Sequence, residues 1–205
     1  ILADWSTNIL NDASETANEA TDENRADAAL YSKADLSIYG SGSLVVDGNY
    51  KEGISVKDGL IIGSGDITVQ AVEDGIYGKD YLVVGDGRVT VTAGKDGLKS
   101  ENEDDTSQGF IEIRGGEINI TSDGDSISAG TDIRISGGTI HLSGGGGSSV
   151  NPNEEISGKG IKASGTIQID GGTISVDTSD DAIHSDTNVI INDGSFSFAS
   201  GDDGI

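Results

Sequence analysis

The fold is decided by residues 74–98, which read DGIYGKDYLVVGDGRVTVTAGKDGL. This stretch opens and closes on the same motif, an acidic residue followed by glycine and an aliphatic residue, and Leu98 follows Ile76 by 22 positions. Between them lie two short runs with apolar residues at alternate positions, LVV at 82–84 and VTV at 89–91. Such alternation is typical of β-strands, and a fixed period indicates a solenoid of stacked units.

Three columns of aliphatic residues repeat this spacing along most of the chain. The second column starts at Leu60 and the third at Ile67, and both advance by 22, 29, 22, 34 and 22 residues. The two long intervals therefore contain insertions of 7 residues, within Glu101–Gln108, and of 12 residues, within Ser143–Ile156. The first column advances by 22, 22, 29, 34, 22 and 22 residues through Ile54, Ile76, Leu98, Ile127, Ile161, Ile183 and Ile205.

The pattern predicts an all-β, right-handed, single-stranded parallel β-helix of about seven rungs of 22 residues, with three short strands per rung. The 32 glycines and single proline fit a chain with many tight corners. Glycine pairs such as Gly115-Gly116 are expected at corners, where a positive φ is needed. We expect residues 30–205 to form the β-helix within a single domain. Residues 1–29 are expected to form an N-terminal loop or cap and a partial first rung.

The composition excludes several classes of protein. The formal net charge is −24, so the phosphates of nucleic acid would be repelled. There is no cysteine, and hence no disulfide or thiolate metal site. The sequence contains no run of 18 apolar residues, which is the length that a membrane-spanning helix needs. The chain begins at Ile1 without a signal peptide, as a trimmed secreted protein or any excised segment would. Oligomeric state is left open by the sequence.

One predicted column is acidic. It lies two residues before the first aliphatic column and consists of Glu52, Asp74, Asp96, Asp125, Lys159, Asp181 and Asp203. Like charges on successive rungs, about 5 Å apart, repel each other, so the column needs neutralising cations. Calcium prefers carboxylate oxygens, which makes it the expected cofactor, first of all near Asp96, Asp105 and Asp125. The candidate ligands are Asp74, Asp96, Asp104, Asp105, Asp125, Asp180, Asp181, Asp202 and Asp203. Alternatively, the aspartates only form turns beside glycine.

Lys159 interrupts the acidic column and has two interpretations. It could be an internal counter-ion for Asp125 and Asp181. It could also be the base of a calcium-assisted β-elimination, which abstracts the proton α to a uronate carboxylate.

Two further columns are expected to face outward. The first lies one residue after the aliphatic column and contains Tyr31, Ser55, Tyr77, Lys99, Ser128, Lys162 and His184. Tyrosine can stack on a sugar ring and lysine can pair with a uronate, so Tyr77, Lys99, Lys162 and His184 are the candidate carbohydrate-binding residues. A plain solvated face is the alternative. The second column is a flat polar face that a crystalline sugar polymer could cover, formed by Thr68, Thr90, Asn119, His141, Ser175 and Ser197.

The order of several short motifs resembles a family of bacterial carbohydrate-binding β-helix proteins. These motifs are Asn49-Tyr50, Lys57-Asp58-Gly59-Leu60, Asp74-Gly75-Ile76-Tyr77-Gly78-Lys79-Asp80, Asp96-Gly97-Leu98-Lys99-Ser100 and Ser179-Asp180-Asp181-Ala182-Ile183-His184-Ser185. The resemblance covers roughly residues 28 to 205. It implies a fold like that of polysaccharide lyases, calcium, and binding of cellulose and acidic pectin (polygalacturonate) outside a bacterial cell, in secreted form or on the cell surface. It also implies calcium binding by paired aspartates, which Asp180-Asp181 and Asp202-Asp203 could match.

Three functions remain open from the sequence. The first is a non-catalytic protein that binds plant cell-wall polysaccharide with bound calcium. The second is a calcium-dependent pectate-lyase-like enzyme, with Lys159, Lys162 or Lys99 as its base; Arg114 and Arg134 lie in strand-centre patterns and are discounted for this role. The third is a structural surface solenoid or adhesin. The chain has few aromatic residues (5 Tyr, 1 Trp and 3 Phe), which favours a broad polar surface over an aromatic platform.

Overall fold

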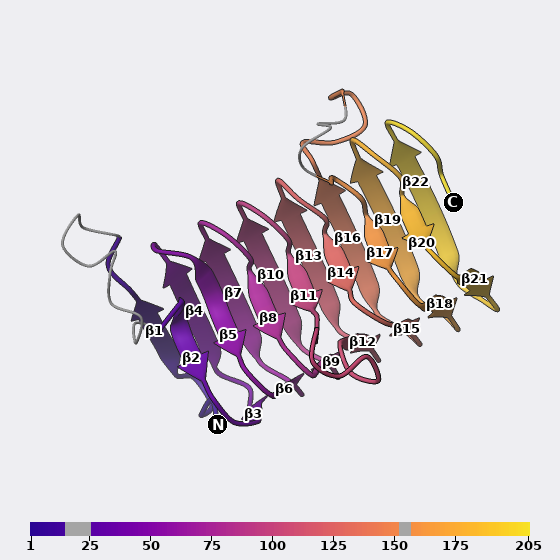
Figure 1. The fold of residues 1–205 in the computed structure, drawn as a ribbon. Coiled ribbons are helices and arrows are strands. Elements are labelled where there is room, and N and C mark those ends of the chain that lie inside the picture. The colour runs from indigo at the N-terminus through magenta and orange to yellow at the C-terminus, as the bar shows by residue number, and fades with distance from the viewer. Residues whose placement is uncertain (15–25, 152–156) are drawn as a thin grey trace.

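The computed structural model describes residues 1–14, 26–151 and 157–205. These residues form 22 β-strands and no helix, and the strands make three parallel sheets that run the length of the molecule (Figure 1). No helix long and apolar enough to cross a membrane occurs in the part of the chain so described.

Each sheet takes one strand from every rung. Sheet A consists of β1 (Thr7–Asn11), β4 (Ser43–Gly48), β7 (Asp66–Ala71), β10 (Arg88–Ala93), β13 (Glu117–Ser122), β16 (Thr139–Gly144), β19 (Thr173–Thr178) and β22 (Ser195–Ser200). Sheet B consists of β2 (Ala28–Ser32), β5 (Glu52–Val56), β8 (Ile76–Gly78), β11 (Leu98–Ser100), β14 (Ile127–Ala129), β17 (Ile161–Ala163) and β20 (Ile183–Ser185). Sheet C consists of β3 (Leu36–Ile38), β6 (Gly59–Ile62), β9 (Tyr81–Val84), β12 (Phe110–Ile113), β15 (Ile133–Ile135), β18 (Thr166–Ile169) and β21 (Asn188–Ile191).

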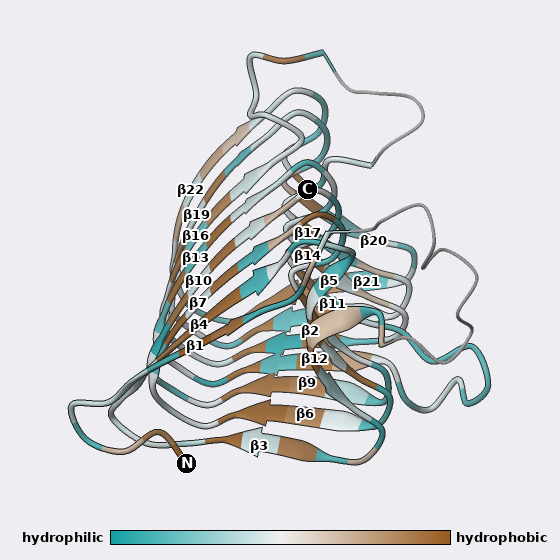
Figure 2. Ribbon diagram, turned by 90° about the vertical axis from the view of Figure 1, so that its left-hand side faces the viewer, coloured by the Kyte–Doolittle hydropathy of each residue, from teal (hydrophilic) through white to brown (hydrophobic). Residues whose placement is uncertain are grey.

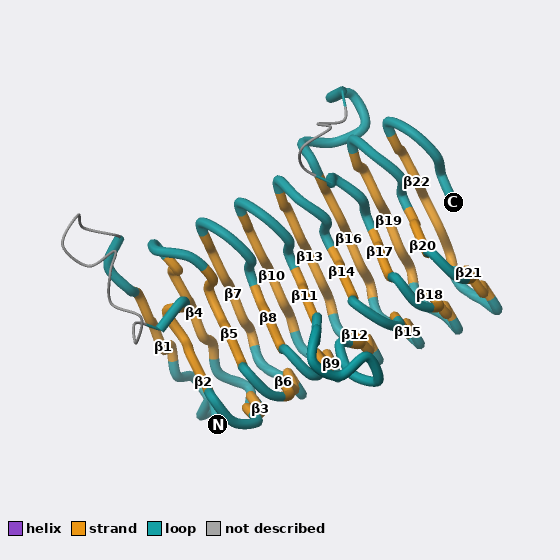
Figure 3. Tube along the Cα trace, viewed as in Figure 1, coloured by secondary structure: helices purple, strands orange, loops and turns teal. Residues whose placement is uncertain are grey.

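The chain passes from sheet B to sheet C to sheet A and then begins the next rung (Figure 3). Strand β11 pairs with β8 and β14 so that Leu98 lies between Ile76 and Ile127. The pairing partners thus follow the intervals of 22 and 29 residues counted in the sequence. The prediction of a parallel β-helix with about seven rungs of three strands is confirmed.

The core is the interior of the coil, enclosed by the three sheets (Figure 2). The first aliphatic column is almost fully buried from Ile54 to Ile183. The other two columns are buried in the same way through most of the stack, as Leu82 and Val89 show. Because each strand is short, it can bury its apolar side chains only when rungs stack above and below it.

Glycine forms the corner between sheets C and A. Gly116 has a φ of +90°, and a Cβ there would lie 2.7 Å from the carbonyl oxygen of Gly87 on the preceding rung. Gly138 and Gly172 repeat the positive φ on later rungs. The predicted role of these glycine pairs is therefore confirmed at the second glycine of each pair.

The two insertions and the N-terminal segment leave the repeat at different places. The first insertion joins β11 to β12, at the corner between sheets B and C, and the second joins β16 to β17, between sheets A and B. Residues 152–156 of the second insertion lie outside the described residues, as do residues 15–25, for which we predicted a loop or cap. Strand β1 already belongs to sheet A, where it pairs with β4.

Candidate functional site

The acidic column lies just before the strands of sheet B or at their first residues. In its inner aspartates, Asp74, Asp96 and Asp125, one carboxylate oxygen has a structural role. Asp74 Oδ1 accepts the backbone amide of Asp96 at 3.0 Å, and Asp96 Oδ1 accepts that of Asp125 at 3.0 Å. Asp125 Oδ1 in turn accepts the amide of Lys159 at 2.9 Å. Each carboxylate therefore joins its rung to the next, which is the turn-forming role that we weighed against metal binding.

The lysine in this column interrupts the pattern because its side chain accepts no hydrogen bond. The amide of Asp181, on the following rung, bonds instead to Asp180 Oδ1 at 2.9 Å. The pattern then resumes, since Asp181 Oδ1 accepts the amide of Asp203 at 3.2 Å. Lys159 Nζ lies 2.6 Å from Asp180 and 3.2 Å from Asp181. The counter-ion role is thus observed for Asp181, but the second partner is Asp180 rather than the Asp125 that we predicted.

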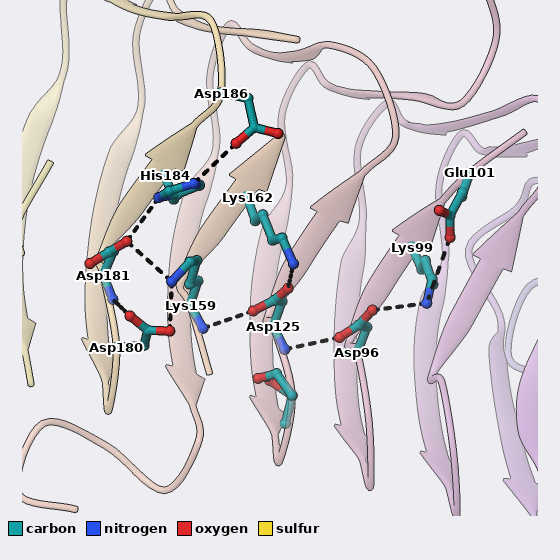
Figure 4. Close-up of polar contacts among 12 residues, drawn as sticks. Asp96, Lys99, Glu101, Asp125, Lys159, Lys162, Asp180, Asp181, His184 and Asp186 are labelled. Atoms are coloured by element: carbon teal, nitrogen blue, oxygen red, sulfur yellow. Dashed lines mark hydrogen bonds and ion pairs between the residues drawn. The ribbon is translucent and has the colours of Figure 1, made fainter. Parts of the chain in front are cut away.

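The second oxygens of Asp74, Asp96 and Asp125 face amines, as Figure 4 shows for Asp96 and Asp125. Lys99 Nζ lies 3.1 Å from Asp96 Oδ2 and 3.5 Å from Asp74 Oδ2. Lys162 Nζ lies 3.1 Å from Asp125 Oδ2, and that carboxylate is almost completely buried. The charges of these three aspartates are therefore compensated by lysines of the same face, whereas Oε2 of Glu52, in the same column, is buried without a hydrogen-bond partner among the described residues.

Burial and neighbouring charge both act on the pKa of these groups. Burial opposes the charge of Lys99, but the carboxylates of Asp96 and Asp74 outweigh it and raise the pKa of the amine well above its ordinary value. Burial also raises the pKa of Asp96, assisted by the charges of Asp125 and Asp74, and Lys99 only partly offsets it. At neutral pH Lys99 is consequently a fixed positive charge.

The first outward column is confirmed in register, but its member Ser55, which was expected to face outward, is completely buried. Lys99 pairs with Tyr77 on one side and Ser128 on the other, and Ser128 pairs with Lys162, which pairs with His184. We call these five residues the sheet B strip. The structure brings together all four residues that we predicted to bind carbohydrate, on neighbouring or near-neighbouring strands.

Both ends of the strip are held in place by contacts. Tyr77 donates its hydroxyl to the carbonyl oxygen of Glu101 at 2.9 Å, and its ring carries the ammonium of Lys57 at 5.4 Å from the centroid. Burial raises the pKa of Tyr77 to about 12. At the other end, His184 contacts Asp181 through Nδ1 at 2.9 Å and Asp186 through Nε2 at 3.2 Å.

Two adjacent hollows lie along the strip. One, of about 290 Å³, is lined by Ser128 and Glu101 among others. The second, of about 390 Å³, reaches back to the acidic column at Asp125. Lys99 and Lys162 line both hollows, so the two amines stand at the place where the hollows meet.

A metal ion could be held at one cluster of carboxylates among the described residues. Oxygens of Asp180, Asp181 and Asp202 all lie within 4.8 Å of one another. The ammonium of Lys159 already contacts two of these three side chains. Three carboxylates are suitable ligands for a hard cation such as calcium. In this structure the ammonium of Lys159 provides the positive charge beside them.

The structure separates the other predicted metal ligands. Asp104 pairs with Lys79, and Asp105 accepts hydrogen bonds from the hydroxyl and the amide of Ser107. Neither joins Asp96 or Asp125, so these two acids of the insertion do not extend the column. Asp74, Asp96 and Asp125 form the inner column described above, and Asp203 lies exposed at its end.

Sequence reasoning missed three contributors to this face. Glu101, at the start of the first insertion, accepts the Tyr77 hydroxyl at its carbonyl oxygen, and its carboxylate lies 4.0 Å from Lys99 Nζ. Lys57 covers the Tyr77 ring, and Asp186 holds His184. The sequence carried a signal for all three, because Glu101 and Asp186 follow the strip residues Lys99 and His184 by two positions, and Lys57 follows Ser55 of the same outward column by two. Residues two apart on a strand share a face.

Comparisons with known proteins agree with this description. Residues 1–204 match the family model described as carbohydrate-binding domain-containing protein. A protein of that same description from Acetivibrio thermocellus is 40% identical over 70 residues, which are 34% of this chain and 24% of the relative. A solved structure, the polysaccharide lyase-like protein from C. thermocellum in its gadolinium derivative, superposes with a TM-score of 0.64 and 26% identity.

The aligned parts differ in extent. The superposition covers 95% of this chain and 66% of the solved protein. This chain thus spans about two thirds of that structure, and the alignment spans about a quarter of the curated relative.

Proposed function

The chain belongs to the family of carbohydrate-binding domain-containing proteins, and from this we propose that it is a non-catalytic domain that binds plant cell-wall polysaccharide along the sheet B strip. The observation that carries the proposal is the pair of hollows that meet at Lys99 and Lys162. The strip crosses five strands, from Tyr77 to His184, which at about 4.8 Å per step is about 19 Å. Such a strip accommodates several sugar rings of one polymer in a row.

We propose acidic pectin (polygalacturonate) as the ligand of the strip, and cellulose as a second polymer bound by the domain. Lys99 and Lys162 offer ammonium groups to uronate carboxylates. Both amines also neutralise internal aspartates, and the protein as a whole is strongly acidic. A polyuronate therefore needs additional positive charge at this face, and calcium bridging protein and polymer carboxylates would supply it.

The cluster of Asp180, Asp181 and Asp202 is the proposed calcium site. Its oxygens lie close enough together to share one cation, and calcium takes six to eight oxygen ligands. Binding requires Lys159 to release Asp180 and Asp181, so the ammonium and the metal compete for the same oxygens. Calcium would add charge beside His184, at one end of the sheet B strip.

The contacts of the lysines favour binding over catalysis. A general base needs an unprotonated amine with a pKa near the working pH. The pKa of Lys99 is raised by Asp96 and Asp74 despite burial. The pKa of Lys159 is likewise raised, because hydrogen bonds to Asp180 and Asp181 outweigh burial. Lys162 is paired with Asp125 at 3.1 Å. A lyase reaction on polygalacturonate is the alternative function.

Polymer binding is tested by electrophoresis through gels that contain polygalacturonate, with calcium or with EDTA, and by pull-down on insoluble cellulose. We expect the wild type to be retarded by polygalacturonate with calcium and released by EDTA. The double variant Lys99→Ala/Lys162→Ala should migrate freely. The control is Arg88→Ala, an exposed residue of sheet A that pairs with Glu117. Equal migration of the wild type and the double variant would contradict the strip, and no retention on either polymer would favour the structural solenoid.

Catalysis is tested in the same mixtures by the ultraviolet absorbance of unsaturated products. We expect no rise with polygalacturonate and calcium. A calcium-dependent rise that disappears in Lys162→Ala or Lys159→Ala would establish the lyase function instead.

Calcium binding is tested with terbium, a luminescent substitute for calcium, and by competition with calcium itself. Asp202→Ala, at an exposed position, should weaken binding. Lys159→Met should strengthen it, because the competing ammonium is gone. Asp66→Ala, an exposed carboxylate of sheet A, serves as the matched control and should leave binding unchanged. Loss of binding in Lys159→Met would contradict the competition.

A location outside the bacterial cell, secreted or on its surface, completes the proposal, since cell-wall polymers are accessible only there. Protection of the protein from added protease in intact cells would argue against it.

A further inference from the structure

The first insertion forms one wall of a third hollow, away from the sheet B strip. The insertion leaves β11 after Ser100 and enters β12 at Phe110, beside sheet C (Figure 1). Thr106 and Ser107 of the insertion face residues of β12 and β15 across a hollow of about 350 Å³. Binding pockets for small molecules begin at about this size.

The wall is braced by hydrogen bonds on both sides. Asn102 Oδ1 accepts the amides of Asp104 and Asp105 at 2.9 and 3.0 Å, and Asn102 Nδ2 donates to Asp80 Oδ1 at 2.7 Å. Asp105 in turn holds Ser107 at 2.7 Å. The wall is therefore preorganised, and a ligand need not order it on binding.

An aromatic ring lines the hollow in a fixed orientation. Phe110 stacks on Tyr81 of the preceding rung, with 5.6 Å between the ring centroids and 21° between the planes. The tyrosine supports one face of the phenylalanine ring, so the side chain keeps its position beside the hollow. Ring carbons of this kind offer an apolar surface to the C–H groups of a sugar.

Oriented polar groups stand next to the ring. Glu112 and Arg134 are register partners on the neighbouring strands β12 and β15 and therefore lie side by side, and both line the hollow. Arg134 donates through Nε and Nη2 to Asp170 Oδ2 at 3.1 and 2.8 Å, which fixes the guanidinium plane. Glu112 accepts from Arg114 at 2.7 Å, and this hydrogen bond holds the pKa of the carboxyl below its ordinary value. The hollow thus offers a charged acceptor and a charged donor at fixed positions, as the hydroxyls of a sugar require.

We propose that this hollow is a second saccharide site, which takes an uncharged pyranose unit against Phe110 and over the neighbouring side chains of Glu112 and Arg134. The inference rests on the proposed function, because it assumes a carbohydrate ligand. The surrounding charges select against a uronate: the carboxylates of Glu112, Asp132 and Asp170 outnumber the guanidiniums of Arg114 and Arg134. Asp105 of the insertion, which holds Ser107, adds further negative charge.

The site is tested with cellotetraose as the uncharged probe and tetragalacturonate as the charged one, followed by backbone amide shifts in NMR titrations. We expect cellotetraose to shift amides of residues 106–112 and 131–134. Phe110→Ala should weaken this binding about two- to tenfold, which is the loss of one good stacking contact. Arg134→Ala changes a side chain that is 58% exposed and spares the fold, and it should also weaken binding. Arg88→Ala is the matched control at another exposed arginine.

The outcomes separate this site from the proposed function. Cellotetraose that shifts only the sheet B strip, or that binds Phe110→Ala and Arg134→Ala as well as wild type, overturns the second site and leaves the proposed function intact. Tetragalacturonate binding in the hollow more tightly than cellotetraose overturns the selectivity. If Lys99→Ala/Lys162→Ala loses polygalacturonate but still binds cellotetraose in the hollow, both sites stand. Neither probe binding anywhere overturns both.

Discussion

Replacing Asp125 tests whether the inner aspartates hold the rungs together. This carboxylate is 3% exposed at its side chain, and it contacts the Lys159 amide through Oδ1 and Lys162 through Oδ2. A hydrogen bond to a charged group contributes about 1.5–3 kcal/mol, and an ion pair with a partly exposed lysine contributes about 0.2–1 kcal/mol. We therefore expect Asp125→Ala to lower the free energy of unfolding by about 2–4 kcal/mol.

Asp125→Asn is the informative comparison, because an amide oxygen can still accept the Lys159 amide. It loses the ion pair and the charge assistance, so the expected cost is only about 1 kcal/mol. Asp104→Ala, at an exposed carboxylate paired with Lys79, is the control and should change stability by less than about 0.5 kcal/mol. The assay is urea unfolding followed by far-UV circular dichroism, since Trp5 is fully exposed and a poor reporter. If alanine costs no more than asparagine, the link through Oδ1 is refuted.

Three further predictions address other groups. Tyr77 should remain un-ionised until about pH 12, so in a spectrophotometric titration Tyr77→Phe should remove the last tyrosine transition; its persistence would show that the ring is not desolvated. The pKa of Asp181 is lowered, because hydrogen bonds from Lys159 and the following rung outweigh burial. The ionised carboxylate of Asp181 therefore stabilises the folded protein fully above the ordinary pKa of aspartate, and this stabilisation is lost as the pH falls through the lower pKa of the folded state. The melting temperatures of wild type and Asp181→Asn should differ at pH 6 and converge below about pH 3. A difference that does not change with pH would contradict the lowered pKa. Gly116→Ala should cost at least about 1 kcal/mol in urea unfolding and Gly115→Ala much less, since only the former has a positive φ; equal costs would contradict the corner geometry.

The fold could be predicted from the sequence because burial is periodic. A residue such as Leu98 must face the core on its own rung and must also stack between Ile76 and Ile127. Burial on one rung and stacking between rungs both require an aliphatic residue every 22 positions, and the insertions only lengthen two of these intervals. The outward column of sheet B follows from the same count, since alternation fixes which residues share a face.

The roles of the acidic residues could be predicted only in part. Position in the column determines which aspartates neighbour each other, but it does not tell which oxygen accepts an amide and which faces an amine. Lys162 pairs with Asp125 across a rung boundary, at a separation in sequence that the second insertion obscures. The hollow beside Phe110 also escaped prediction, because it requires an insertion to fold over a neighbouring sheet.

Asp104 and Asp105 of the first insertion were expected near Asp96 and Asp125, but they lie at a different corner of the coil. The acidic column lies before the strands of sheet B, at the corner with sheet A, whereas Asp104 and Asp105 follow a sheet B strand, at the corner with sheet C. A short strand separates the two corners on every rung, so proximity along the repeat did not bring these carboxylates to the column. The order of motif and insertion in the sequence already contained this information.

The balance of charge along the column decides where an added cation would be most favourable. In the middle rungs, Asp74, Asp96 and Asp125 have Lys99 and Lys162 beside them. Near the C-terminal end, the three carboxylates that approach within 4.8 Å have one lysine between them, with a histidine alongside. Carboxylates outnumber fixed positive charges more strongly there, and one of the three is exposed. Repulsion between like charges is therefore relieved less at that end than in the middle rungs, which moves the calcium proposal from the Asp96 and Asp125 rungs to the last rungs of the stack.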